Sequence, residues 1–97
     1  MPKTRTRPYD AAAYLQSDGD TAAYLQAALD DGDPAIVIHA IGNIARARGM
    51  ARVAREAGLK PETLSKALSP EGKPEFAMVL KVVRALRIGL HAEPVGP

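Results

Sequence analysis

Met50-Ala-Arg-Val-Ala-Arg-Glu-Ala-Gly-Leu-Lys-Pro-Glu-Thr-Leu-Ser-Lys-Ala-Leu-Ser69 has the spacing of two short helices joined by a tight turn. Ala54 is small enough to let two helices approach closely, and Gly58, four residues later, can take the positive φ of such a turn. The buried side of the second helix is expected to consist of Leu59, Leu64 and Ala67. The stretch therefore predicts a helix-turn-helix, although an ordinary αα-corner can match this pattern by chance.

The outward side of the second helix has the polar character of a recognition helix that reads base edges and phosphates in the major groove. We expect base contacts from Ser65, Lys66 and Glu62, whose carboxylate can accept from cytosine N4. The residues predicted to contact DNA are Arg46, Arg48, Arg52, Arg55, Lys60, Glu62, Thr63, Ser65, Lys66 and Lys73. Long basic side chains on exposed helix faces are most often only solvated, so about half of these residues are expected to make no contact.

Charge is distributed unevenly along the chain, although the formal net charge is only +2. Six aspartates and no Lys or Arg lie between Tyr9 and Asp33. From Pro34 to Arg87 the balance reverses, with ten Lys or Arg residues against four glutamates. The first segment would repel DNA, whereas the second contains the predicted DNA reader.

The length of 97 residues suits one small domain with extensions and is too short for a separate catalytic domain. The absence of cysteine excludes disulfides and thiolate zinc sites. No apolar run reaches the roughly 20 residues of a membrane span, and no signal peptide is present, so we expect a soluble cytoplasmic protein. His39 and His91 lack partners for catalysis or metal binding, so no enzyme activity, metal site or cofactor is expected.

The rest of the chain predicts further helices. Asp10 can cap a short helix through Tyr14 and Leu15, and Asp20 can cap a second helix over residues 21–29. Asp33-Pro34 begins a core helix that runs to about Arg48, where Gly49 stops it. After a loop over residues 69–74, one more helix is expected. Its buried face is predicted to contain Phe76, Val79, Leu80, Val83 and Leu86.

The segment from Ile88 to Glu93 alternates apolar and other residues, which predicts a short β-strand that ends at Pro94. A lone strand must pair, and pairing with a second copy would give a homodimer with a two-fold axis. The expected dimer contacts are Ile88, Leu90 and Ala92. The alternative is a tail that packs Ile88 and Leu90 onto its own domain. The expected divisions are thus an N-terminal acidic part (1–33), a helix-turn-helix domain (34–87) and a C-terminal strand or tail (88–97).

The order of these features resembles the probable addiction-module antidote proteins, which are HigA-like antitoxins. The segments that carry the resemblance cover nearly the whole chain: Tyr9-Asp10 with Tyr14-Leu15, Ala23-Tyr-Leu-Gln-Ala-Ala-Leu29, Asp33-Pro-Ala35, Ile44-Ala-Arg-Ala-Arg-Gly-Met50, Val53-Ala-Arg-Glu-Ala-Gly-Leu59, Leu64-Ser-Lys-Ala-Leu-Ser69, Gly72-Lys-Pro-Glu-Phe76 and Val79-Leu-Lys-Val-Val-Arg-Ala-Leu86. The Ala-Leu-Ser-Pro-Glu-Gly loop, residues 67–72, is the most distinctive piece.

The resemblance implies an all-α, Cro/repressor-like helix-turn-helix bundle with N-terminal acidic helices and a short C-terminal strand. It also implies an antitoxin that sequesters a RelE/ParE-like toxin and represses the shared promoter through operator DNA. Because toxins that handle RNA tend to be basic, the acidic segment is a complementary surface for one. The expected toxin contacts are Tyr14, Asp18, Asp20, Tyr24, Asp30 and Asp31. Without a partner, this segment would be a solvated acidic face.

Two positions depart from the pattern of the related domains, which commonly begin both helices of the motif with a Ser or Thr cap. Ala51-Arg52 stands at the first and Lys60-Pro61 at the second, so both caps are lost and the operator sequence can differ from that of relatives. The main alternative to an antitoxin is a stand-alone prophage-type repressor. The genes that lie beside this one would distinguish the two functions. A pure protein-interaction module would expose apolar anchors rather than Lys60, Ser65 and Lys66.

Overall fold

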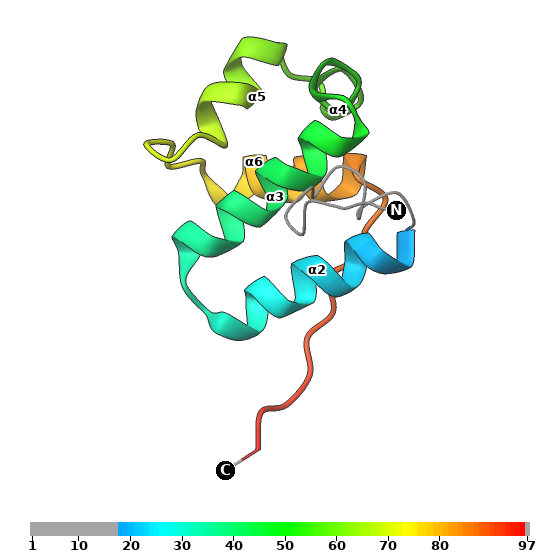
Figure 1. Ribbon diagram of the computed structural model, residues 1–97, viewed down its shortest axis with the longest axis vertical. Helices are drawn as coiled ribbons and strands as arrows, with labels where there is room; N and C mark the ends of the chain where they lie inside the picture. The colour runs from blue at the N-terminus through cyan, green and yellow to red at the C-terminus, as the bar shows by residue number, and fades with distance from the viewer. Residues whose placement is uncertain (1–17, 97) are drawn as a thin grey trace, which may run out of the picture.

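The computed structural model describes residues 18–96, so the helix expected to begin at Asp10 lies outside the described residues. This part of the chain folds into five α-helices, α2 (Asp18–Asp31), α3 (Pro34–Arg48), α4 (Met50–Ala57), α5 (Pro61–Ala67) and α6 (Phe76–Ala85) (Figure 1). No strand occurs within residues 18–96, so the described architecture is all-helical. None of these helices has the length and apolar character needed to cross a membrane.

The central helix α3 begins and ends where the sequence predicts. The Asp33 carboxylate accepts a hydrogen bond from the backbone N–H of Ala35 at 2.9 Å, and Pro34 occupies the first turn. At the other end, Gly49 takes a φ of 101° and its N–H donates to the carbonyl of Arg46. Both ends of α3 are therefore set by local chemistry that the sequence already shows.

The turn between α4 and α5 also follows the prediction. Gly58 adopts the left-handed conformation (φ 76°, ψ 29°), and the N–H of Leu59 donates to the carbonyl of Ala54 at 2.8 Å. Ala54 and Leu64 are fully buried where the two helices meet. Helix α5 ends at Ala67, and Leu68 forms its C-cap.

The core draws side chains from all five helices. Its buried members are Leu25 of α2, Ile41, Ile44 and Ala45 of α3, Val53 and Ala54 of α4, Leu64 of α5, Leu68 in the following loop, and Val82, Val83 and Leu86 in and after α6. Helix α3 packs against α2 and α4, and α4 packs against α5 and α6. This chain of contacts positions α4 and α5 at one end of the molecule and α2 at the other (Figure 1).

Hydrogen bonds between side chains join α2 to α3. The Asn43 amide donates to the Tyr24 hydroxyl at 2.8 Å, and Arg46 donates to the Asn43 carbonyl oxygen at 2.7 Å. One turn further along, Arg48 donates to the hydroxyl of the fully buried Thr21 at 3.1 Å. These contacts align the two helices over much of their length.

Helix α2 starts at Asp18 and ends at Asp31, so the expected bounds of 21–29 were too short and Asp20 lies inside the helix. The cap was assigned from residue type, which favours Asp at a helix start. The helix begins earlier than Asp20, and Thr21 is fixed within it through its contact with Arg48. Residue type alone therefore placed the start of this helix too late in the sequence.

The predicted buried face of α6 was wrong at two positions. Phe76 is 71% exposed and Leu80 is 39% exposed, whereas Val82, Val83 and Leu86 are buried. Apolar residues lie on more than one side of this helix, so helical periodicity alone permits several rotations of it. Packing against α4 selects the rotation that leaves Phe76 on the surface.

The strand expected over residues 88–93 is absent from this chain. Ile88 donates its N–H to the carbonyl of Val83 at 3.2 Å and packs partly buried against the core. Beyond it, the segment extends away from the helices past α2, and Leu90 remains 41% exposed (Figure 1). A strand requires a ladder partner, and residues 18–96 of one chain supply none.

Replacement of Arg87 by glycine is expected to stabilise the fold. Arg87 follows the end of α6 with a φ of 63°, a conformation that costs an L-residue about 1–2 kcal/mol. Glycine relieves this cost, but it also increases the entropy of the unfolded chain, which offsets part of the stabilisation. We therefore expect the free energy of unfolding, measured by urea titration, to rise by up to about 1 kcal/mol. Arg84→Gly, which removes the same charge from within α6, should destabilise by about 1 kcal/mol. Equal destabilisation by both variants would contradict this account of Arg87.

Tyr24→Phe is expected to lower the unfolding free energy by about 1 kcal/mol, because it removes the acceptor for the half-buried Asn43 amide while keeping the ring. Thermal and urea unfolding provide the measurement. Gln26→Ala is a matched control on the same helix, since it removes an exposed bond to Asp30 and should change stability by less than about 0.5 kcal/mol. A Tyr24→Phe variant as stable as the parent would show that the bond contributes nothing.

Candidate functional site

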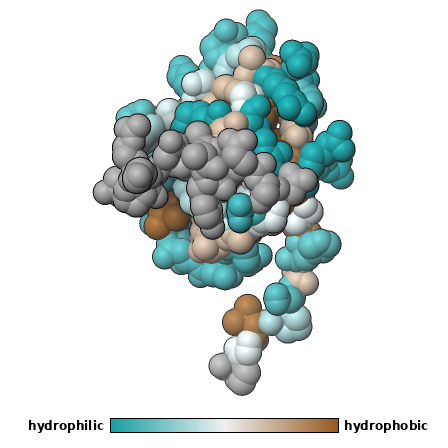
Figure 2. All heavy atoms as spheres, turned by 45° about the vertical axis from the view of Figure 1, so that its right-hand side comes forward, coloured by the Kyte–Doolittle hydropathy of each residue, from teal (hydrophilic) through white to brown (hydrophobic). Residues whose placement is uncertain are grey.

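The outer face of α5 is almost entirely polar. Leu64 is the one fully buried side chain of this seven-residue helix. The predicted contact residues on and before α5 are all exposed: Lys60, Glu62, Thr63, Ser65 and Lys66. Figure 2 shows hydrophilic side chains gathered over the end of the molecule that α4 and α5 form. The structure thus brings these five side chains together on one short helix that is anchored from behind.

Both helices of this pair lack a side-chain cap, as expected from Ala51-Arg52 and Lys60-Pro61. The N-cap of α4 is Gly49, which has no side chain, and the side chain of Lys60 at the N-cap of α5 makes no capping hydrogen bond. Pro61 nevertheless begins α5 with a helical φ. The start of α5 therefore depends on proline geometry and on the burial of Leu64.

Helix α4 contributes two exposed arginines to the same end of the molecule. Arg52 pairs with Glu56 one turn later, with 3.4 Å between Nε and Oε2, and the two side chains are 67% and 38% exposed. An exposed pair of this kind contributes at most about 1 kcal/mol, so the guanidinium can exchange its partner at little cost. Arg55 is exposed as well.

The other cations in the predicted set lie elsewhere. Arg48 is half-buried and bonds to Thr21, so it joins α3 to α2. Arg46 is exposed but directs its guanidinium to Asn43. Lys73 lies in the loop before α6, where it lines a groove described below. The ten candidates for DNA contact therefore do not form one continuous surface.

An acidic surface lies at the C-terminal end of α2. Asp30 and Asp31 are exposed in its last turn, which contains no basic residue. Of the other residues predicted there, Asp20 is half-buried in the first turns of α2, and Tyr24 uses its hydroxyl to bind Asn43. Tyr14 lies outside the described residues, as does the side chain of Asp18. Asp30 and Asp31 thus form the most accessible part of this surface.

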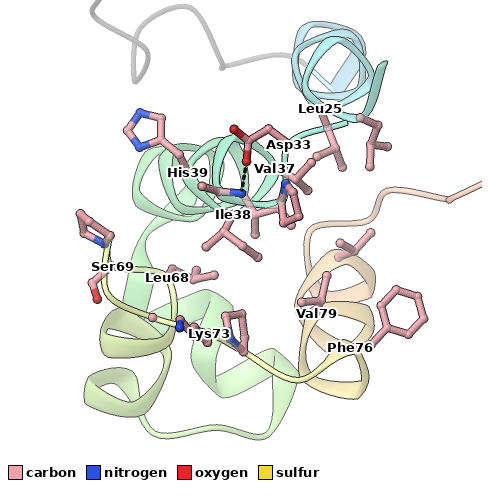
Figure 3. Close-up of a pocket in the computed structure, with 18 of the residues that line it drawn as sticks. Leu25, Asp33, Val37, Ile38, His39, Leu68, Ser69, Lys73, Phe76 and Val79 are labelled. Atoms are coloured by element: carbon pink, nitrogen blue, oxygen red, sulfur yellow. Dashed lines mark hydrogen bonds between the residues drawn. The ribbon is translucent and has the colours of Figure 1, made fainter. Parts of the chain in front are cut away.

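An apolar groove of about 870 Å³ was not predicted from the sequence. It is lined from one side by the end of α2 and the first half of α3, and from the other by the loop after α5 and by α6 (Figure 3). Its apolar lining includes Leu25, Leu29, Val37, Ile38, Phe76, Val79 and Leu90. The signal in the sequence was an excess of apolar residues on α6, which the prediction placed in the core.

Neither histidine belongs to a site of the kind that binds metal. His39 is exposed on α3 and His91 is exposed in the C-terminal segment. Among residues 18–96, no three His, Cys, Asp or Glu side chains group closely enough to hold a metal ion.

Known proteins resemble the chain over nearly its whole length. Residues 5–94 match the model of a family described as "Probable addiction module antidote protein". A protein of Haemophilus influenzae described as "Uncharacterized protein" is 42% identical over 87 residues, which cover 90% of each of the two chains. No solved structure matches the chain.

Proposed function

The chain belongs to the family of probable addiction module antidote proteins, and from this premise we propose that it neutralises a RelE/ParE-like toxin and represses its own operon through operator DNA. The match over residues 5–94 carries the antitoxin part of this proposal. The exposed polar face of α5 supports the DNA-binding part. In this proposal residues 1–33 serve toxin binding, 34–87 bind DNA, and 88–97 join two copies.

In the DNA complex, α5 enters the major groove as the recognition helix of a Cro/repressor-like helix-turn-helix. Ser65, Lys66 and Glu62 contact base edges, with Thr63 beside them. Lys60, Arg52 and Arg55 contact phosphates. The structure supports this subset of the predicted contacts, because these residues are exposed on α4 and α5 whereas Arg48 bonds to α2.

Two copies bind an inverted repeat, with their α5 helices in successive major grooves about one helical turn apart. The C-terminal segments pair as strands across the two-fold axis, which would give the extended backbone after Ile88 the ladder partner that one chain does not offer. Leu90 and Ala92, both exposed, contact the second copy, while Ile88 stays against its own core.

Toxin binding uses the acidic surface of α2. Asp30 and Asp31 lie in the last turn of the helix, where the partial negative charge of the helix dipole adds to their own. A basic toxin relieves this accumulation of negative charge, and the long-range attraction raises its association rate. Expression of the neighbouring toxin gene alone should stop growth, and co-expression of this chain should restore it.

Lys60→Ala is expected to weaken binding to the promoter of its own operon and to lower the slope of log affinity against log salt concentration by about 1, because one phosphate contact is lost. Ser65→Ala should instead reduce the preference for that promoter over unrelated DNA. Fluorescence anisotropy at several salt concentrations measures both effects. Lys81→Ala, an exposed lysine on α6, is the control and should leave both quantities unchanged. Equal affinity of the parent for promoter and unrelated DNA would contradict operator recognition.

A further inference from the structure

The groove beside α6 is lined by apolar side chains that remain partly exposed to solvent. Leu29 and Phe76 line the groove and remain 39% and 71% exposed. In Figure 3 the side chains of α3 face those of the loop and α6 across the groove, and the ring of Phe76 lies at its outer edge. Apolar side chains gathered around one groove are typical of a surface that binds another molecule.

One wall of the groove is rigid. The loop after α5 is held by hydrogen bonds from the Ser69 hydroxyl to the carbonyl of Lys66 at 2.7 Å and from the Gly72 N–H to the carbonyl of Ser69 at 2.9 Å. A Cβ on Gly72 would collide with the carbonyl group of Ala67, so the loop lies directly against the end of α5. A groove with such a wall is preformed, and binding to it needs little ordering of the loop.

Among residues 18–96, Asp33 is the carboxylate that lines the groove, and the N–H of Ala35 holds it toward the start of α3. Asp30 and Asp31 precede Asp33 in the chain and lie at the C-terminal end of α2, where the helix dipole adds negative potential. We call Asp30, Asp31 and Asp33 the acidic rim. Lys73, in the opposite wall, is the one lysine or arginine among residues 18–96 that lines the groove.

We propose that this groove binds the toxin through a segment that inserts an apolar side chain between α3 and α6 and places a lysine or arginine against the acidic rim. This inference rests on the proposed function. It adds an apolar contact to the acidic residues that the proposed function assigns to toxin binding. Charge favours this occupant over the C-terminal segment of a second copy. Residues 88–97 contain no lysine or arginine to pair with the acidic rim, and Glu93 adds a negative charge to that segment.

The test measures the affinity of full-length variants for the purified protein encoded by the neighbouring gene, by isothermal titration calorimetry. Phe76→Glu and Leu29→Glu are expected to weaken binding at least about tenfold, because a carboxylate would enter the apolar groove beside the acidic rim. Both side chains are partly exposed, so the fold should persist, and circular dichroism checks this. Leu80→Glu is the matched control, since Leu80 has the same 39% exposure as Leu29, shares α6 with Phe76 and does not line the groove.

The outcomes separate this inference from the proposed function. Toxin binding by both groove variants as tight as that of Leu80→Glu would overturn the inference and leave the antitoxin proposal intact. Failure of the parent chain to bind the neighbouring protein would overturn both. Loss of self-association without loss of toxin affinity, seen by sedimentation, would assign the groove to a second copy and also overturn the inference. Unchanged promoter affinity in the groove variants is expected, because no residue of α5 lines the groove.

Discussion

The packing of α3 against α2 and α4 is the constraint on which the rest of the structure depends. Ile44 and Ala45 of α3 are fully buried, and small residues beside them let other segments approach closely. At Gly42 a Cβ would lie 3.3 Å from the carbonyl oxygen of Leu68, so the end of the α5 region sits almost against the α3 backbone. The position of α5 therefore follows from the apolar side of α3, although the two helices are separated in sequence by α4.

The same packing separates two chemically different surfaces. The polar face of α5 lies at the end of the molecule away from α2, while the acidic rim lies where α2 turns into α3 (Figure 1). The acidic rim would repel phosphates. At ordinary salt concentrations, however, dissolved ions largely screen this repulsion beyond about 10 Å. A chain that binds both DNA and a basic protein benefits from this separation, because neither partner needs the surface of the other.

Local signals were sufficient where one residue decides one feature. Asp33 and Pro34 begin α3, Gly49 ends it, and Gly58 makes the turn before α5. Each of these effects acts within one helical turn and needs no distant contact. The predicted start of α3 at Pro34 and its end near Arg48 agree with the structure for this reason. The helical class was implied by the family resemblance, which also implied a C-terminal strand that residues 18–96 do not contain.

Predictions that required knowledge of distant contacts were less accurate. Helical periodicity could not choose which side of α6 faces α4, so Phe76 and Leu80 were assigned to the core, although they are exposed. Composition could not show that Arg48 bonds to Thr21 of α2. The groove, too, exists only because segments from both ends of the described chain meet. The sequence by itself thus determined the two ends of α3 and the turn between α4 and α5, which depend on local hydrogen bonds and backbone conformation. Only the tertiary structure decided which apolar side chains remain outside the core, because that depends on how the helices rotate against one another.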